Sequence, residues 1–566
     1  MGADMSEALR RNAEKRLAML KNERTSWEQN WRELSDFIQP MRSRLLCDQQ
    51  VNKGDRRNNK IINNEATEDA GALAAGMMSG LTSRSRPWFN LVVQSKEAME
   101  FGPVKSWLFE ATERVRDVLL RSNFYNCQHV SYLEMGVFGT GAIWIDEDPK
   151  NGIRCEVFTA GEYYVANGAD GRCNAFYREF KLTAAQMAER FGKENLSPQA
   201  QNALKEARQD QWFDCVQMVE PNADYLPGAK VSRLLPYVSL VWEKSATPDK
   251  VLEHRGFHEF PVAVVRWDTL PGDCYGTGPG RRCLGDIKAL QLYERSSARM
   301  AETGSNPAVQ APMSLQGKPS STNPGSITYV DQVGAQNSIM PIYEPNPQWL
   351  AVIEGKIARH EARIRRSFYT DLFLMISEMD DVRTATEINA RREEKMAMLG
   401  PVVERVDYEG LDPIIERVFG IMLRQSMPIW AGIIDGEPLL PEPPEELGQN
   451  VVEADYISIL AQAQKAGAVN GLERIAATIG NLSGAFPEVR DKFDADQWVD
   501  EYAEAAGVVP TVIRGDEEVA AIREQRARQQ QAAEAQQALA SGIEGAKLLS
   551  ETQVTPDNAL GQLLGA

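Results

Sequence analysis

The chain has 566 residues, of which 43% are hydrophobic, 25% charged and 8% aromatic, and its formal net charge is −18. This composition is ordinary for a folded protein and excludes a chain that is disordered throughout, collagen-like or a small disulfide scaffold. The acidic balance argues against a protein that holds duplex DNA on a broad basic face, because such binding needs a cationic surface.

Charge, cysteine and hydropathy patterns narrow the class further. Residues 431–520 carry 18 acidic and 5 basic side chains, whereas residues 1–60 carry 13 basic and 9 acidic ones, so the charge is segregated. The seven cysteines are widely spaced and form no CxxC pair, which favours a reduced intracellular protein. No apolar run approaches the ~18 residues of a membrane span, and the first twenty residues lack the apolar core of a secretory signal.

The first half of the chain is predicted to mix helices and strands. Apolar residues recur at helical intervals over 5–38 and 105–123, and an Ala-, Gly- and Met-rich stretch over 64–81 predicts a tightly packed helix. A further helical stretch covers 183–208, and short strands begin from Gly136 onward. The expected strands are 141–146, 154–158, 213–219, 262–267 and 237–243, the last half-buried because apolar and polar residues alternate.

Two long helices separated by a proline-rich segment are predicted next. Apolar residues line one face of 281–303 and one face of 349–376. The intervening segment 304–348 holds seven of the 29 prolines, a density that excludes a helix and most central strands. Only 326–333 is typical of a strand there, so we expect a compact β-containing tip between the helices.

The remaining chain is expected to be largely helical. A third long helix covers about 384–424, with a kink near Gly400 because Pro401 removes a helical hydrogen bond. A Pro/Glu-rich linker leads to short helices in 452–510. The stretch 517–541 lacks an apolar face, which is typical of a helix that is solvated or bundles with its copies.

No motif for catalysis or nucleotide binding is convincing. The glycines of 276–280 lack the spacing of a dinucleotide fingerprint, and Pro279 removes an amide, so they indicate a turn before a helix. At 317–320, Pro319 displaces the Ser/Thr that a phosphate loop requires. The four histidines form no HExxH and are interpreted as structural or solvated. We therefore predict no catalytic residue, no metal ligand and no cofactor.

Two acidic clusters keep an alternative open. Two-metal nucleases need carboxylates that converge in a cleft, usually on strand ends. Both clusters lie at predicted helix boundaries, where acidic groups stabilise the helix dipole, and we favour that interpretation. The alternative function is a metal-dependent nucleic-acid-processing enzyme that uses one of these clusters: Glu378, Asp380 and Asp381, or Asp491, Asp494, Asp496 and Asp500.

A basic stripe runs along the second long helix, beside its apolar face. The first long helix adds five more basic residues. An exposed helix face is the simpler interpretation, and the alternative is a local basic belt that guides a polyanion weakly or pairs with acidic neighbours. The stripe comprises Lys356, Arg359, Arg363 and Arg366.

Short segments in a fixed order carry a resemblance to a known family. The most specific is Arg-Thr-Ala-Thr-Glu-Ile-Asn-Ala-Arg at 383–391, followed by Leu-Gly-Pro at 399–401. Others are Glu-Gln-Asn-Trp-Arg-Glu-Leu at 28–34, Gly-Val-Phe-Gly-Thr-Gly-Ala at 136–142, Ala-Gly-Glu-Tyr-Tyr-Val at 160–165 and Tyr-Gly-Thr-Gly-Pro at 275–279. Over about 5–530 the chain resembles the portal, or head-to-tail connector, proteins of short-tailed tailed bacteriophages.

The resemblance implies an α+β, mainly helical fold with a portal architecture assembled as a ring. Its expected regions are a wing of mixed α/β structure, a two-helix stem, a β-containing clip and a helical crown. Their bounds are 1–280 wing, 281–303 first stem helix, 304–348 clip, 349–376 second stem helix, 377–383 tunnel loop, 384–436 kinked long helix of the wing, 437–516 crown and 517–566 C-terminal helix and tail.

The resemblance also implies a function, with no catalysis of its own. A ring of twelve copies would sit at one capsid vertex of the virion after assembly in the host cytoplasm. DNA would pass through its channel, and a terminase, a tail adaptor, and the major capsid and scaffolding proteins would bind it. A host-encoded scaffolding protein without a channel is a third possibility. The implied site residues are the tunnel-loop residues Ser377, Glu378, Met379, Asp380, Asp381, Val382 and Arg383, the basic stripe as the DNA- or partner-facing stem, and the clip residues Lys318, Tyr329 and Asp331.

Overall fold

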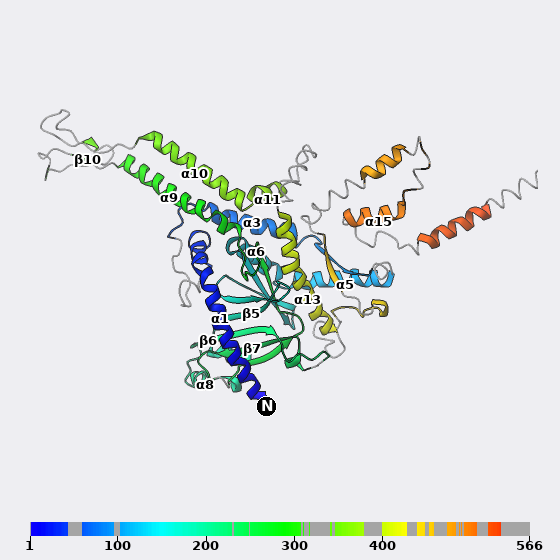
Figure 1. Ribbon diagram of the computed structural model, residues 1–566, viewed down its shortest axis with the longest axis horizontal. Coiled ribbons are helices and arrows are strands. Elements are labelled where there is room, and N and C mark those ends of the chain that lie inside the picture. Colours follow the sequence, from blue (N-terminus) through cyan, green and yellow to red (C-terminus); the bar gives the residue numbers. More distant parts are fainter. Residues whose placement is uncertain are drawn as a thin grey trace, which may run out of the picture. The chain divides into compact units, whose positions relative to one another are not determined.

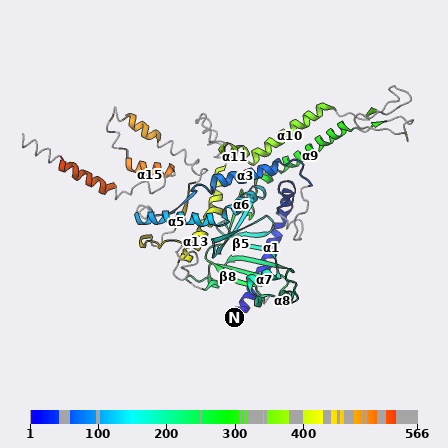
Figure 2. The same ribbon diagram turned by 180° about the vertical axis from the view of Figure 1, so that it is seen from behind.

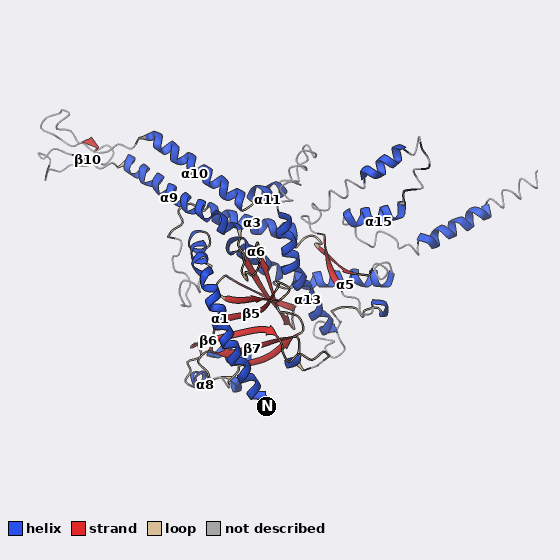
Figure 3. Ribbon diagram, in the orientation of Figure 1, coloured by secondary structure: helices blue, strands red, loops and turns tan. Residues whose placement is uncertain are grey.

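The computed structural model contains both long helices and antiparallel sheets, as predicted for an α+β fold (Figure 3). Its residues form two compact units, each described by itself below. The larger unit comprises Met1–Leu91, Ala111–Pro441 and Glu453–Gly471, and the smaller one the rest of the chain. The structure describes residues 2–42, 59–95, 102–228, 231–247, 250–306, 309–310, 316, 340–341, 346–377, 399–426, 439–447, 452–457, 473–482, 486, 488, 492–506 and 519–533.

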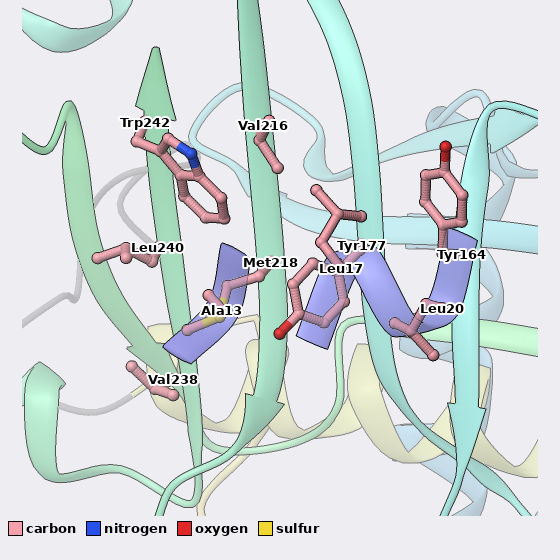
Figure 4. Close-up of a cluster of buried hydrophobic side chains, with 10 residues drawn as sticks. All are labelled: Ala13, Leu17, Leu20, Tyr164, Tyr177, Val216, Met218, Val238, Leu240 and Trp242. Carbon is pink, nitrogen blue, oxygen red and sulfur yellow. The ribbon is translucent and has the colours of Figure 1, made fainter. Parts of the chain in front are cut away.

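A five-stranded antiparallel sheet lies at the centre of the larger unit, with the strand order β4-β5-β6-β7-β8 (Figure 1). Residues 13, 17 and 20 of the long helix α1 (Gly2–Phe37) are spaced three and four apart, so they share one helix face. That face packs on the sheet against Tyr177, Met218 and Trp242 (Figure 4). The strands are β4 Tyr163–Asn167, β5 Cys173–Thr183, β6 Trp212–Pro221, β7 Tyr237–Glu243 and β8 Glu253–Phe257.

The opposite face of this sheet is also covered. Helices α7 (Ala184–Phe191) and α8 (Pro198–Lys205) pack there against Phe213 and Val241, whose side chains alternate with those facing α1. Residues after Tyr237 in β7 are therefore buried on both faces, and the prediction of a half-buried strand was wrong.

The helix predicted over 183–208 is interrupted. Thr183 and Gln186 form a capping box at the start of α7, and Gly192, with φ 81°, ends it. Ser197 then starts α8 by accepting a hydrogen bond from the Ala200 amide. Short 3₁₀ turns lie at Lys193–Asn195, Ser232–Leu234 and Glu445–Leu447.

Two buried arginines fasten α1 to the sheet. Arg10 donates hydrogen bonds to the carbonyl oxygens of Thr247 and Lys250, both at 2.8 Å, and of Glu243 and Ala246. Arg24 donates hydrogen bonds to the carbonyl oxygens of Gly161 and Tyr163. Its guanidinium stacks 3.8 Å from the centre of the Tyr164 ring. Each guanidinium therefore joins α1 to several backbone carbonyl groups of the sheet region at once.

A smaller three-stranded sheet has the order β3-β2-β9. The predicted strands are present as β2 (Thr140–Asp148), β3 (Gly152–Phe158) and β9 (Val262–Arg266). Helix α6 (Phe124–Phe138) was missed, because it is buried on nearly all sides and so shows no amphipathic stripe. It ends at Gly139, where φ is 90° and an added Cβ would lie 2.3 Å from a backbone oxygen of Gly276. The expectation that Gly136 opens a strand was therefore wrong.

Helices α3 and α5 have the predicted positions. Helix α3 is Glu65–Leu81 and α5 is Gly102–Arg121. The tight packing expected of α3 is evident at Gly76, where a Cβ would lie 2.1 Å from the Phe373 ring. The apolar residues that recur at helical intervals in α5 are buried: Trp107, Leu108, Ala111, Val115 and Leu119.

The helical residues 399–426 contain a π turn. Residues 399–406 are α-helical, Asp407–Leu411 form the π turn, and α13 (Asp412–Ser426) follows. Glu409 in this turn accepts two hydrogen bonds from the guanidinium of Arg266 in β9, at 2.9 and 2.6 Å. The chain before 399 lies outside the described residues from 378 onward, so the kink near Gly400 stays a prediction.

The C-terminal region differs in part from prediction. Val452–Tyr456 is not helical but forms strand β12, which pairs with β1 (Phe89–Val93). Within the smaller unit, residues 473–482, α15 (Ala495–Ala506) and residues 519–533 are helical, the last with mostly exposed side chains. Tyr502 of α15 donates a hydrogen bond of 3.0 Å to Glu473.

Candidate functional site: a polar seam between two long helices

The helices predicted over 281–303 and 349–376 lie side by side as α9 (Pro279–Ser305) and α10 (Pro347–Ser367) (Figures 1 and 2). Each has proline at its first turn, where the missing amide costs no helical hydrogen bond. Asn346 caps α10 by accepting a hydrogen bond of 2.9 Å from the Gln348 amide. Beyond their distal ends, β10 (Val309–Gln310) pairs with β11 (Met340–Pro341) in antiparallel fashion.

The second long helix is shorter than predicted. It ends at Ser367, and a separate helix α11 (Thr370–Ser377) follows. Tyr369 between them has a φ of 57°, a left-handed conformation that breaks the helix. The apolar stripe continues through the break with Phe368 and Leu372, both buried, which is why periodicity alone indicated one helix.

A polar seam joins the middle of α9 to α10. His360 Nδ1 lies 2.8 Å from Asp286 Oδ1, and Arg363 Nη1 donates a hydrogen bond of 3.2 Å to the same oxygen. Tyr293 stacks on the His360 ring with centroids 5.5 Å apart, and the Lys356 ammonium lies 5.1 Å from the Tyr293 ring centroid. The seam therefore fixes the register of the two helices.

A loop residue closes the seam from the side. The side-chain amide of Asn63 donates hydrogen bonds to Glu294 of α9 and to Glu361 of α10, each at 2.9 Å. Gln291 accepts hydrogen bonds from the Ile62 and Asn63 amides, at 2.6 and 3.0 Å. The chain just before α3 thus holds both long helices at once.

The pair is apolar and buried at one end and exposed at the other. Ile287, Leu290 and Ile364 are fully buried near α3 and α6. At the start of α10, Trp349 and Val352 are 60% and 47% exposed in the single chain, and Leu292 in the middle of α9 is 61% exposed. The distal part of the pair therefore presents large apolar side chains to its surroundings.

The four residues of the basic stripe all have exposed side chains on α10. Lys356 and Arg363 are engaged with α9, as described above. Arg359 and Arg366 form no ion pair within the described part of the chain. The structure therefore divides the stripe into two residues that join the helices and two that carry unpaired positive charge.

Other predicted site residues have varied positions. Ser377 is the last residue of α11, while 378–383 and the clip residues Lys318, Tyr329 and Asp331 lie outside the described residues. In the second acidic cluster, Asp496 forms two hydrogen bonds of 2.7 Å with Arg523, and Asp494 accepts amide hydrogen bonds at the start of α15. Those two carboxylates thus lie at a helix boundary, as predicted.

Asp69 lies beneath the break between α10 and α11. It accepts a hydrogen bond of 2.9 Å from the Thr370 hydroxyl and is buried. Burial raises the pKa of this carboxyl from 3.8 to about 6, against the lowering effect of the Thr370 hydrogen bond.

Within the described residues, no group of three or more His, Cys, Asp and Glu side chains gathers closely enough to hold a metal ion. No helix in that part of the chain combines the length and apolar content needed to cross a membrane. The arrangement is one of packing and electrostatics, with exposed cations and apolar side chains on two long helices.

Sequence reasoning missed most of the seam. Asp286 and His360 are 74 positions apart, and neither departs from its own helical pattern in a way that identifies the other. The histidine was interpreted as structural or solvated, and its contact with Asp286 agrees with a structural role. The only signal in the sequence is that Asp286 adjoins the apolar stripe of its helix.

Comparison with known proteins identifies the class. The family described as "Bacteriophage head to tail connecting protein" matches residues 10–514, and the chain belongs to this family. The chain is 38% identical over 564 residues to the portal protein of Salmonella phage epsilon15, covering 99% of both. It is 37% identical over 546 residues to the probable portal protein of Bordetella phage BPP-1, covering 96% of both.

Solved structures give a weaker likeness. A chain in the virion of a native gene transfer agent particle has a TM-score of 0.30 and 12% identity, covering 73% of this chain and 84% of that one. A chain from the neck of that particle, computed with C12 symmetry, has a TM-score of 0.31. These scores are too low to establish a common arrangement of the elements.

Proposed function

We propose that the protein is a phage portal that forms a ring of twelve copies at one capsid vertex. DNA passes through the ring during packaging and ejection, and the ring serves as a docking platform for a terminase and a tail adaptor. The observation that carries the proposal is the 38% and 37% identity, over nearly the full length, to the portal protein of one phage and the probable portal protein of another. Assembly takes place in the host cytoplasm with the major capsid and scaffolding proteins.

The regions of the chain have proposed roles in this ring. The α/β body of 1–280 is the wing, and α9 with α10 and α11 forms the stem, in agreement with two long helices lying side by side. Segment 304–348 is the clip, and 384–436 is the long helix of the wing. Residues 437–516 form the crown and 517–566 the C-terminal extension.

The exposed apolar side chains of the helix pair support assembly. Leu292 and Trp349 project from the pair at 61% and 60% exposure, which is costly for a helix surrounded by water. Packing against the helix pair of an adjacent copy would remove them from water.

An acidic channel wall with few cations suits a polymer that must slide. A surface that bound phosphates tightly would stall DNA, because each neutralised phosphate adds to its affinity. We propose that Asp380 and Asp381 in the tunnel loop keep the DNA centred by repulsion. Arg359 and Arg366 on the stem supply weak attraction.

The ring is tested by imaging the purified protein and measuring its mass in solution. Twelve copies of 63.1 kDa amount to about 757 kDa, and we expect rings of that mass with a central hole. Monomers or dimers without a hole at every concentration, and in the presence of scaffolding protein, would contradict the proposal.

The tunnel loop is tested by Asp380→Lys combined with Asp381→Lys. We expect phage particles carrying this variant to package or retain several-fold less DNA, because attraction replaces repulsion at the proposed tunnel loop. Asp380→Glu with Asp381→Glu keeps the charge and serves as the matched control. DNA content per particle equal to wild type in the lysine variant would remove the loop from the mechanism.

A further inference from the structure

A basic pocket lies between the two sheets of the larger unit, away from the helix pair. It has a volume of about 410 Å³ and is lined from β3, from β5 and from α7, which follows β5 directly. The positions of β5 and α7 can be followed in Figure 2. Its lining holds four cationic side chains and one anionic one: Arg154, Arg178, Lys181, Arg190 and Glu156.

The deepest of these cations is Arg178. Its residue is 6% exposed, its Nε donates a hydrogen bond of 2.9 Å to Gln217, and its Nη1 lies 3.0 Å from Glu156. Arg178 donates no other side-chain hydrogen bond within the described residues, and its guanidinium packs 4.9 Å from the Phe158 ring centroid and 4.5 Å from that of Phe180. A guanidinium that lines a pocket and has donors not used in hydrogen bonds is a binding group for an oxyanion.

The remaining cationic residues of the lining add positive charge that is only partly paired. Lys181 is paired with Asp214 at 3.5 Å. Arg154 and Arg190 are exposed and form no ion pair in the part of the chain that the structure describes. Four cations of the lining thus stand against three carboxylates, Glu156 in the pocket and Asp214 and Glu162 beside it, so the pocket is a positive site on a chain whose net charge is −18.

The walls favour a peptide over a free phosphate or DNA. Phe180 lies between two guanidinium groups, 4.5 Å from Arg178 and 6.0 Å from Arg190, and Leu182 continues the apolar wall. Glu156 opposes the second charge of a phosphate. The volume is in the range of ligand pockets, roughly 300–1,000 Å³, whereas duplex DNA needs an extended cationic surface.

We propose that this pocket is a docking site for an acidic peptide segment of a partner polypeptide. One carboxylate of the segment binds Arg178, a second binds Arg154 or Arg190 at the rim, and an adjacent apolar side chain lies against Leu182. The pocket is complete within one chain, so the proposal holds whether or not twelve copies form a ring.

The test measures binding of a fluorescent hexapeptide of alternating Glu and Leu to the full-length protein by fluorescence anisotropy at physiological salt. We expect Arg154→Glu combined with Arg190→Glu to weaken binding at least tenfold, with folding intact because both side chains are exposed. Arg208→Glu is the matched control, since Arg208 is exposed and lies outside the pocket lining.

Four outcomes would overturn the proposal. They are absence of binding to the wild-type protein, equal binding of a peptide with Gln in place of Glu, equal binding by the double variant, and equal weakening by Arg208→Glu. Inorganic phosphate and a short DNA duplex are run in parallel. Binding of either in place of the peptide would show that the ligand class is wrong.

Discussion

Helices α1 and α10 both carry basic residues at helical spacing, but their side chains lie in opposite environments. Arg10 and Arg24 of α1 are 1% and 5% exposed, and each donates to backbone carbonyl oxygens of the sheet region. Arg359 and Arg366 of α10 are exposed and unpaired among the described residues. The same residue type thus fastens one helix to its support and leaves the other with charge available to a partner.

The pattern of charges in the sequence does not decide whether an arginine is buried and hydrogen-bonded or exposed. A guanidinium has five donors, and whether they are used depends on which carbonyl groups the fold brings near. The end of β7 and the loop that follows it bring four such groups to Arg10 from more than 200 positions away. The tests below start from this contrast.

The largest effect is expected for Arg10→Met. The change removes four hydrogen bonds of a buried guanidinium to carbonyl oxygens, two of which keep a backbone donor, and should lower the free energy of unfolding by about 3 kcal/mol. Urea titration of the full-length protein measures it. Lys15→Met, at an exposed position on the same helix, is the control, and equal losses for both variants would show that Arg10 fastens nothing.

A half-buried carboxylate without such hydrogen-bond donors should have the opposite effect on stability. Asp407 in the π turn accepts no side-chain hydrogen bond from the described residues. Burial, with Asp412 and Glu404 nearby, raises its pKa from 3.8 to about 7. Because the native carboxyl keeps its proton to higher pH than the unfolded one, its contribution to stability is fully present below pH 3.8 and is lost as pH rises through 7.

Asp407→Asn removes the ionisable group, so the variant should not lose this stability as the pH rises. We expect a gain in stability on the order of 1 kcal/mol at pH 8 and almost none at pH 4, measured by thermal unfolding at both pH values. A gain of the same size at both pH values, or a loss at pH 8, would contradict the assigned cause.

The contacts between α9 and α10 should contribute less to stability than the hydrogen bonds of Arg10. Asp286→Asn weakens the contacts with His360 and Arg363, which are partly exposed, and should cost about 0.5–1 kcal/mol. The readout is urea titration, with Glu302→Gln on the exposed surface of α9 as the control. A cost equal to that of Arg10→Met would mean that the seam carries as much stability as the fastening of α1.

The smallest effect on stability is expected at the exposed stem arginines. Arg359→Gln with Arg366→Gln should change the free energy of unfolding by less than about 0.5 kcal/mol, because no native partner is lost. DNA content per phage particle should nevertheless fall if these cations guide DNA. Wild-type DNA content would leave the stripe as a solvated face, the simpler of the two original interpretations.

Elements with a one-sided pattern could be predicted from the sequence, and elements shaped by their neighbours could not. Helices α1, α3, α5 and α9 have apolar stripes or compositions that identify them. Helix α6 has none because it is surrounded, and the break at Tyr369 falls within an unbroken apolar stripe. The contacts of Asp286 and Arg178 join residues that only the tertiary fold brings together.

The π turn at Asp407–Leu411 changes the direction in which side chains point from the helix over 399–426, so residues before and after the turn follow different faces. One extra residue in a turn displaces everything after it by about 100° around the helix axis. Arg417 and Arg424 meet Glu259, at 2.7 and 2.6 Å, only with that displacement. Loss of one residue from the turn would rotate both arginines away and leave Glu259 unpaired. This stretch of chain therefore withstands exchange of its residues better than a change in their number.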